Sequence, residues 1–341
     1  MLLKTEPCLE KALKILEEPV LIISSQVGGG NVSIGEALKE RLKDYKVSHV
    51  LIEDIEPSAL IREDILRYKF ISDNFPFVLN LIYRIPIFYY RKLARERIFK
   101  NKNLKRLRET IDSLKIKTVV SISHRPTFWL SVLKKNEKLS FKLYGLLTEF
   151  GKNLGWKYIF WEVIDGFFSP LSRKELSLII PDNVRYFTIE PFCRLSFYNS
   201  SYIKGDINKV LIMAGYWGQI FFYKIRNILN QILKELPQMQ IVVVCGTNEK
   251  LFRKLRFYFE SNQRVAVYGQ LKSILEPMLE CASIITKPGF STIIEAFITK
   301  KAIFLLKGMP VAEDNNAKYA IANFDAQWFS IKNFIIWHNS M

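Results

Sequence analysis

The sequence lacks most of what a secreted, membrane-spanning or zinc-stabilised protein requires. Its four cysteines form no Cys-x-x-Cys pair; they are Cys8, Cys193, Cys245 and Cys281. This spacing excludes a zinc ribbon and favours a reduced cytoplasmic protein without a metal site. No apolar run reaches the roughly 18 residues that span a bilayer, since Arg84 and other positions interrupt the nearest one, residues 75–90. The N-terminus has no long apolar stretch, so we expect no signal peptide.

Acidic residues are few relative to basic ones. The chain has 50 Lys and Arg against 33 Asp and Glu, a formal net charge of +17. Most of the excess lies in residues 62–138, where 19 Lys or Arg stand against 7 Asp or Glu, a net of +12. Such a concentration of positive charge requires an anionic partner, which is either an anionic membrane or a nucleic acid.

Short apolar runs alternate with helical patterns along most of the chain. A helix is expected at residues 34–45. The predicted strands are residues 19–24, 46–53, 118–123, 209–214, 240–245, 265–268 and 283–286. Continuous Val and Ile runs are typical of parallel strands covered on both faces, and their alternation with helices predicts an α/β fold.

A polar stretch at residues 198–206 interrupts this series, and the series then restarts. We interpret the stretch as a linker between two α/β domains, residues 1–198 and 207–341. Ligands of open α/β sheets bind beyond the carboxyl ends of the strands, so a cleft between the two domains is the expected site.

A run of three glycines, Gly28, Gly29 and Gly30, follows the first predicted strand and precedes a helix. Glycines allow the backbone to approach a ligand closely, and a helix N-terminus offers amide groups to an anion. The run could also be only a tight strand-to-helix turn. It is not a Walker loop, because no Gly-Lys-Ser/Thr follows.

A second motif, Thr-Lys-Pro-Gly-Phe-Ser-Thr-Ile-Ile-Glu, occupies residues 286–295. We expect a strand to end there, Pro288 and Gly289 to turn, and Ser291 or Thr292 to cap a helix. The helix N-terminus would face a diphosphate. Glu295 would lie about one turn further on, where its carboxylate can accept both hydroxyls of a ribose; the alternative is an exposed helical acid.

Together these motifs resemble the monogalactosyldiacylglycerol synthase and bacterial diacylglycerol glucosyltransferase family. A more distant resemblance is to the N-acetylglucosaminyltransferase that makes lipid II. The resemblance covers nearly the whole chain, and residues 286–289 with 295–296 are its most specific part. The other matching segments are residues 28–30, 147–149, 165–170, 213–218 and 244–250, of which 165–170 would close the N-terminal sheet.

The resemblance implies a GT-B fold, in which two Rossmann-like domains face a central cleft. It implies an inverting hexosyltransferase that moves glucose or galactose from a UDP-sugar to diacylglycerol or a related lipid. No cofactor is expected, because a helix dipole and amides would bear the charge of the leaving diphosphate. Gly28, Gly29 and Gly30 would form the acceptor loop. The implied donor-binding residues are Gly215, Gly218, Leu271, Lys287, Pro288, Gly289, Ser291, Thr292, Glu295, Glu313 and Asn316.

The sequence departs from the family at the expected general base. The family's glycine loop ends in a histidine, whereas this chain has Asn31. An amide cannot accept a proton at neutral pH, so another group must do so. We favour Glu149, which follows a strand, with His124 as the second candidate. The alternatives are that Glu149 is a surface acid and His124 a hydrogen-bonded turn residue.

Other departures concern the donor side and the end of the chain. Phe290 replaces a glycine, so either its side chain crowds the phosphates or a positive φ is not needed there. Ala312 replaces a glutamine that contacts the sugar. The chain stops at Met341, and the second domain is expected to lack the family's final helices. These departures leave two other hypotheses open, a catalytically impaired relative and a sugar-nucleotide epimerase of the same fold.

The basic segment itself predicts a membrane contact. Residues 84–108 contain ten Lys or Arg and one acid, Glu96, and aromatic residues precede them. Part of it, with Leu104, Leu107, Ile111 and Leu114 at helical spacing, is expected to pack inward. The residues expected at the membrane are Tyr83, Arg84, Phe88, Tyr89, Arg91, Lys92, Arg95 and Arg97.

This pattern predicts a peripheral protein on the cytoplasmic face of an anionic membrane, whose lipids could also activate it. A solvated basic helix is the plain alternative. RNA is another alternative, but no RNP-type or KH-type motif supports it, and we expect no nucleic-acid partner.

Overall fold

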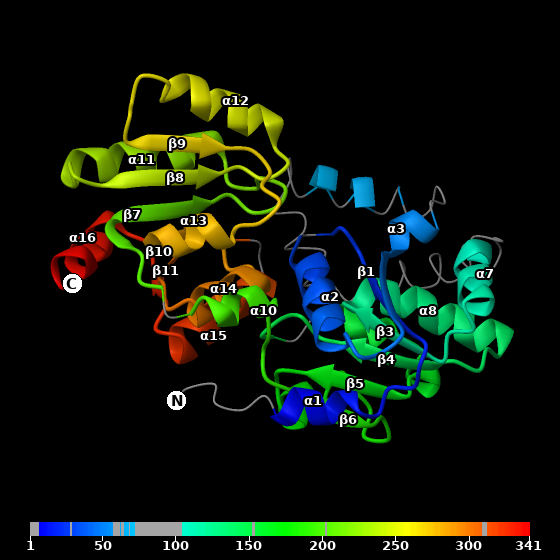
Figure 1. Cartoon of the computed structure of the whole chain (residues 1–341). Helices are drawn as coiled ribbons and strands as arrows, with labels where there is room; N and C mark the ends of the chain where they lie inside the picture. The colour runs from blue at the N-terminus through cyan, green and yellow to red at the C-terminus, as the bar shows by residue number, and fades with distance from the viewer. Residues whose placement is uncertain are drawn as a thin grey trace. The chain divides into compact units, whose positions relative to one another are not determined.

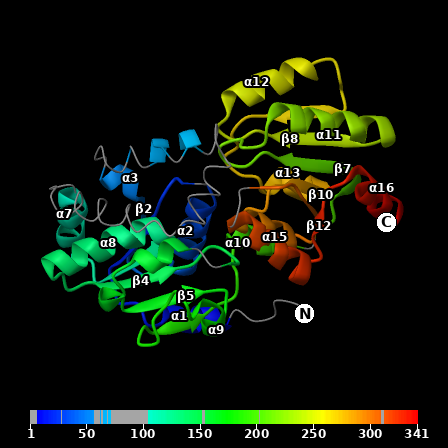
Figure 2. The same cartoon turned by 180° about the vertical axis from the view of Figure 1, so that it is seen from behind.

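The computed structural model describes residues 7–27, 29–56, 62, 65–67, 69–71, 104–151, 154–201, 203–308 and 312–341. The chain forms two compact units (Figures 1 and 2). The first consists mainly of the residues up to Arg194 and includes residues 310–312, and the second consists mainly of the residues from Leu195 on and includes residues 28–30. Each has its own parallel sheet with helices, which confirms the predicted α/β fold class.

The sheet of the first unit has six strands in the order β2-β1-β3-β4-β5-β6. Its strands are β1 (Val20–Ser24), β2 (Val47–Leu51), β3 (Thr118–Ile122), β4 (Lys142–Leu146), β5 (Gly166–Ser169) and β6 (Tyr186–Thr188). Its helical segments are α1 (Pro7–Leu13), α2 (Gly29–Arg41), α3 (Ile52–Ile55), α7 (Lys105–Ser113), α8 (His124–Glu137), η1 (Leu154–Tyr158), η2 (Trp161–Val163) and α9 (Arg173–Leu176). Every residue of β1 and β3 is buried, because helices such as α8 cover the sheet.

The second unit has a six-stranded parallel sheet in the order β12-β11-β10-β7-β8-β9. Its strands are β7 (Asp206–Met213), β8 (Gln240–Val244), β9 (Val265–Tyr268), β10 (Cys281–Thr286), β11 (Ala302–Leu305) and β12 (Gln327–Trp328). Its helices are α10 (Leu195–Asn199), α11 (Phe222–Glu235), α12 (Glu249–Tyr258), α13 (Leu275–Glu280), α14 (Phe290–Ile298), α15 (Ala312–Asn323) and α16 (Ile331–Asn339). On α11, Ile225, Leu229 and Ile232 are fully buried at helical spacing, so one stripe of this helix carries its packing.

Some predicted elements have different limits in the structure. The helix predicted at residues 34–45 is α2, which already begins at Gly29 and ends at Arg41. The strand predicted at residues 46–53 ends at Leu51, and Glu53 lies in the short helix α3. The segment predicted to close the N-terminal sheet contains β5, but β6 pairs with β5 and forms the edge instead. The pattern of apolar residues in the sequence locates these helices and strands. The residues at which they end depend on contacts between segments.

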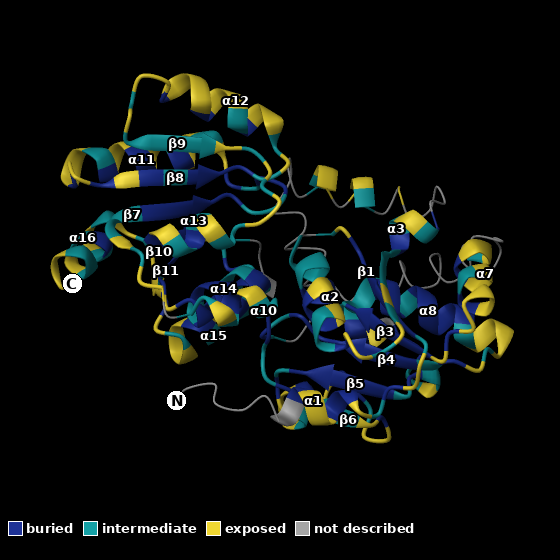
Figure 3. Ribbon diagram, viewed as in Figure 1, coloured by how far each residue is buried: buried dark blue, intermediate teal, exposed yellow. Residues whose placement is uncertain are grey.

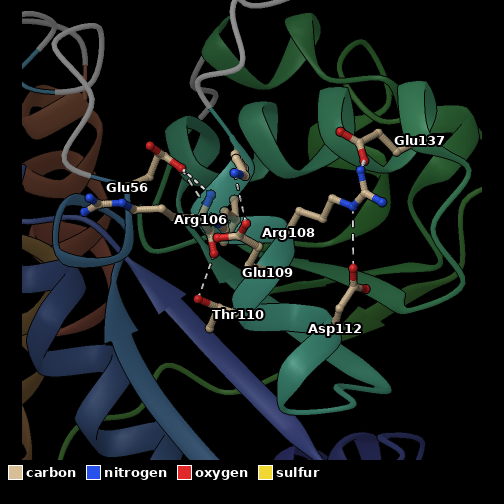
Figure 4. Close-up of polar contacts among 9 residues, drawn as sticks. Glu56, Arg106, Arg108, Glu109, Thr110, Asp112 and Glu137 are labelled. Carbon is tan, nitrogen blue, oxygen red and sulfur yellow. Dashed lines mark hydrogen bonds and ion pairs between the residues drawn. The ribbon is translucent and has the colours of Figure 1, made fainter.

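Helix α7 contains the last residues of the basic segment and is held by a carboxylate at its N-terminus. Glu56 is buried, and its Oε2 accepts hydrogen bonds from the backbone N–H groups of Arg106 at 3.1 Å and Leu107 at 3.4 Å (Figure 4). A carboxylate there complements the partial positive charge of the helix end, while burial raises the pKa of Glu56.

The inward packing predicted for this part of the chain is confirmed for Leu107 and Ile111, which are buried. It is wrong for Leu114, which follows the last turn of α7 and is 46% exposed. The cations of α7 have acidic neighbours: Arg108 contacts Glu137 at 2.7 Å and Asp112 at 3.5 Å (Figure 4). These ion pairs offset the positive charge that Arg108 contributes to the surface of the basic segment.

Candidate functional site

In the second unit, the loops that follow the strands gather at one edge of the sheet. Strands β7, β8, β10 and β11 are parallel neighbours, so their carboxyl ends point the same way. The turns after them hold the glycine-rich segment 214–218, the segment 245–248, the turn 287–289 and residues 306–308. This edge is where an open α/β sheet binds its ligand.

The glycine-rich turn after β7 depends on residues without a β-carbon. Gly215 and Gly218 have φ of +84° and +59°, and Gly246 in the neighbouring loop has φ of +63°, a region that glycine adopts readily. Asn248 connects the two loops. Its Nδ2 donates to the carbonyl of Gly218 at 3.1 Å, and its Oδ1 accepts from the backbone N–H of Leu251 at 2.9 Å, which caps α12.

The turn after β10 leads directly into α14. The prediction that Ser291 or Thr292 caps this helix is wrong: Gly289 occupies the N-cap position and no side chain accepts a hydrogen bond there. The helix starts earlier because Phe290 already has a helical conformation. Of the two alternatives for Phe290, the structure therefore supports the one in which a positive φ is not needed. The N-terminal end of α14 keeps amide groups and a partial positive charge that suit a phosphate.

Helix α15 is tied to this turn by two predicted donor-binding residues. The ammonium of Lys287 donates to the Oε1 carboxylate oxygen of Glu313, and both side chains are largely buried. Asn316, also buried, donates from Nδ2 to the carbonyl of Pro288 at 3.1 Å. A β-carbon at Gly215 would lie 2.5 Å from the Cε of Lys287, so the two residues are close neighbours, and the φ of +84° favours glycine at this position.

Glu295 and Leu271 complete the predicted donor set. Glu295 lies in α14 and is 2% exposed, so the alternative of an exposed helical acid is wrong. Leu271 lies in the loop after β9 and is half-buried. The second unit thus brings Gly215, Gly218, Lys287, Pro288 and Gly289 together through side-chain contacts or chain continuity.

In the first unit, the candidate residues follow the carboxyl ends of adjacent parallel strands. Asn31 comes after β1, His124 after β3, and Glu149 after β4. An acceptor loop was predicted at Gly28, Gly29 and Gly30. Gly29 and Gly30 instead lie in the first turn of α2, and Gly28 lies outside the described residues. The side chain of Asn31 contacts the backbone before α2 and the loop after β4: its Nδ2 donates to Val27 O at 3.3 Å, and its Oδ1 accepts from Thr148 Oγ1 at 2.8 Å.

His124 begins α8, and the residue before it, Ser123, has a positive φ of +74°. Its ring packs against Gly155, where a β-carbon would collide with it, and lies 6.3 Å from the Trp156 ring. Burial first, and then the positive charge of Arg125, lower the pKa of His124 to about 3. Glu149 lies three residues after the end of β4 and is half-buried.

One carboxylate at this edge was not singled out from the sequence. Glu53 of α3 accepts hydrogen bonds at Oε1 from Ser25 Oγ and from the backbone N–H of Gln26 at 3.1 Å. Its Oε2 is buried without a partner among the described residues, and burial raises its pKa. Glu53 follows β2, and β2 pairs with β1, the strand that precedes the glycine run. An acidic residue at the end of a predicted strand is the sequence signal that could have identified it.

The remaining predicted residues lie elsewhere. All eight residues expected at the membrane fall outside the described residues. In the ranges that the structure describes, no helix is both long enough and apolar enough to cross a bilayer. In the same ranges, His, Cys, Asp and Glu form no group of three that could hold a metal ion.

No family model matches the chain. It is 27% identical over 317 residues to the processive diacylglycerol beta-glucosyltransferase of Bacillus mycoides strain KBAB4, covering 88% of this chain and 79% of that protein. The fold resembles Acinetobacter baumannii MurG, with a TM-score of 0.55, 13% identity and coverage of 94% and 90%. It also resembles the UDP-GlcNAc 2-epimerase of Methanocaldococcus jannaschii, with a TM-score of 0.51, 12% identity and coverage of 94% and 91%.

These comparisons confirm the resemblance, the GT-B fold and the glycosyltransferase class that the motifs predicted. The fold by itself does not separate transferases from epimerases, because both occur among the similar structures. The chain is thus a GT-B protein that is similar, over most of its length, to bacterial diacylglycerol glucosyltransferases.

Proposed function

We propose that this protein transfers glucose or galactose, with inversion, from a UDP-sugar to diacylglycerol or a related membrane lipid. The single observation that carries the proposal is the turn after β10, where Gly289 is the N-cap of α14 and no side chain occupies the amide groups that could bind a phosphate. Similarity to diacylglycerol glucosyltransferases over 88% of the chain supports the lipid acceptor.

On the donor side, the diphosphate would lie at the N-terminus of α14. There, backbone amides and the helix dipole would bear the negative charge that develops on the leaving group. Lys287 is held close by Glu313 and adds a cation beside Gly215. These groups supply the stabilisation that a bound metal gives in other transferases.

On the acceptor side, a base must take the proton of the lipid hydroxyl as the new bond forms. Asn31 cannot do so, and its amide is already hydrogen-bonded to Val27 and Thr148. A base acts best when its pKa is near the working pH, which disfavours His124 because its pKa is about 3. We therefore propose Glu149, after β4, as the base.

Incubation with a radiolabelled UDP-sugar and vesicles that contain diacylglycerol and anionic lipid tests the proposal. Label that extracts with the lipid, from either UDP-glucose or UDP-galactose, is the expected result. Release of a converted free sugar would instead identify an epimerase. UDP binding without turnover would identify an impaired relative, and either of these two outcomes overturns the proposal.

A further inference from the structure

The second unit carries an exposed surface of aromatic and basic side chains on α11 and α12, two helices that pack together. We call it the aromatic-basic face; it consists of Phe222, Tyr223, Arg226, Lys254, Phe257 and Tyr258. Figure 3 shows α12 as one of the most exposed helices of its unit. Tyr223 is 66% exposed, Phe257 81% and Tyr258 48%. Aromatic side chains so exposed and so close together mark an interaction surface.

Helical spacing places these residues on one side of each helix. On α11, Phe222 and Tyr223 precede Arg226 by four and three positions, and on α12, Lys254 precedes Phe257 and Tyr258 by three and four. Residues at these spacings are neighbours on a helix surface. The two rows meet, since the ring centroids of Phe222 and Tyr258 lie 6.2 Å apart.

The cations of this face are surrounded by rings and not by carboxylates. The Arg226 guanidinium carbon lies 5.7 Å from the Phe222 ring centroid, 5.3 Å from that of Tyr223 and 5.4 Å from that of Tyr258. The Lys254 ammonium lies 5.8 Å from the Phe222 centroid. Neither cation forms an ion pair with any described residue.

The local charge is strongly positive. Residues 222–227 and 249–258 hold six Lys or Arg against one acid, Glu249. That acid is engaged with Arg253 at 2.9 Å. The excess positive charge of these two segments attracts a negatively charged surface.

We propose that the aromatic-basic face is a membrane contact on the second unit, which binds anionic phospholipid headgroups. Lys254 and Lys250, one turn earlier and also exposed, would lie beside the phosphates, and Phe257 would enter the headgroup layer. This contact is separate from the basic segment at residues 84–108 and does not require that the protein transfers sugar.

The geometry favours a lipid surface over single-stranded nucleic acid. Nucleic acids bind such surfaces by stacking bases on aromatic rings. Here the rings of Phe222, Tyr223 and Tyr258 already contact the Arg226 guanidinium. The face also lies on the outside of two packed helices and offers exposed phenyl surface, which suits the broad interface of a bilayer.

A fluorescent label at position 257 tests this contact directly. In the full chain with Cys8→Ser, Phe257→Cys would carry an environment-sensitive dye, because Cys193, Cys245 and Cys281 are buried. Vesicles of phosphatidylcholine mixed with phosphatidylglycerol should shift its emission to shorter wavelength, whereas pure phosphatidylcholine vesicles should not. The same dye at Lys234→Cys, about 12 Å from Arg226 along α11, is the control and should not respond.

Charge substitutions give a second measurement. Lys250→Gln with Lys254→Gln should weaken vesicle binding about tenfold, because each basic residue near an anionic surface contributes about fivefold before screening. Lys234→Gln with Lys332→Gln, exposed lysines elsewhere in the same unit, should change it little.

An unshifted dye at position 257 while the protein sediments with anionic vesicles would overturn the proposal, as would a response only to added RNA. Absence of sugar transfer with a shifted dye would contradict the proposed function and leave this contact intact.

Discussion

At the scale of single residues, the asparagine at position 31 means that another side chain must act as the general base. Replacing Glu149 by Gln should keep UDP binding but lower turnover by about 10²–10⁴-fold, the usual contribution of a general base. His124→Gln should lower turnover much less, since a group with a pKa of about 3 holds a proton poorly at neutral pH. Steady-state transfer assays with calorimetric UDP titrations would measure both effects.

Asn31→His complements these two variants, because it introduces the histidine that the resembling family has at this position. A histidine ring could accept the hydrogen bond that Thr148 now donates to Asn31, and should raise turnover if the first turn of α2 presents it to the acceptor. A large loss in His124→Gln and a small one in Glu149→Gln would move the role of base to His124. Inactivity of both the wild type and Asn31→His would point to the donor positions Phe290 and Ala312.

Glu295 is the second residue whose role can be measured. We expect its carboxylate to hold the ribose hydroxyls, so Glu295→Gln should weaken UDP binding by roughly 1–3 kcal/mol, as for other charged hydrogen bonds. Gln is preferred to Ala because Glu295 is 2% exposed and truncation would leave a cavity in α14. Calorimetry on a folded Glu295→Gln protein that shows unchanged UDP affinity would remove Glu295 from the site.

His124 should make the stability of the protein sensitive to acid. Its folded pKa of about 3 is below the ordinary 6.5, so the unfolded chain binds the proton more readily. The stabilisation is complete above pH 6.5 and is lost as the pH falls from 6.5 toward 3, by at most about 1.4 kcal/mol per pH unit.

Urea unfolding of the wild type and His124→Gln across this range measures the effect. The difference in the free energy of unfolding between the two proteins should be constant above pH 6.5. It should move in favour of the variant as the pH falls. A difference that does not depend on pH would show that His124 is not buried in its neutral form.

At the scale of elements, Asn248 joins a turn to a helix. It caps α12 through Oδ1 and holds the Gly218 carbonyl through Nδ2. Asn248→Ala should lower the free energy of unfolding by about 1–2 kcal/mol, which is typical of a lost N-cap. Because the same turn holds Gly215, UDP affinity should fall as well. Denaturant unfolding and UDP calorimetry would test this.

Asn248→Asp is the control, since a carboxylate retains the cap but cannot donate to Gly218. It should cost less stability than Asn248→Ala and still weaken UDP binding. Equal stability of Asn248→Ala and the wild type would show that the α12 cap contributes nothing.

At the scale of the whole molecule, the positive charge should direct the protein to anionic membranes. Sedimentation with anionic vesicles should decrease as salt rises, because exposed charges are screened beyond about 10 Å at 0.1 M. Replacing Arg91, Lys92, Arg95 and Arg97 by Ser should release much of the protein, with residual binding through the aromatic-basic face.

Lys105→Ser is the control for this experiment. Lys105 already contacts Glu109 at 3.5 Å, so its loss should change binding little. Equal sedimentation with neutral and anionic vesicles would contradict the electrostatic account.

The amino-acid sequence by itself determined the α/β class and the positions of seven strands, because continuous Val and Ile runs that alternate with helical patterns are typical of buried parallel strands. It also placed the turn at residues 286–289, since Pro288 and Gly289 interrupt any regular element. Local chemistry is sufficient for such features.

Only the tertiary structure decided how the candidate residues are used. Helix α14 starts at Phe290, with Gly289 as its N-cap, and this start leaves Ser291 and Thr292 inside the helix. Lys287 pairs with Glu313, 26 positions along the chain, because β11 runs parallel beside β10 and returns the chain to the same edge of the sheet. The lowered pKa of His124 and the raised pKa of Glu53 follow mainly from burial, and burial is set by segments distant in sequence, which no local pattern reports.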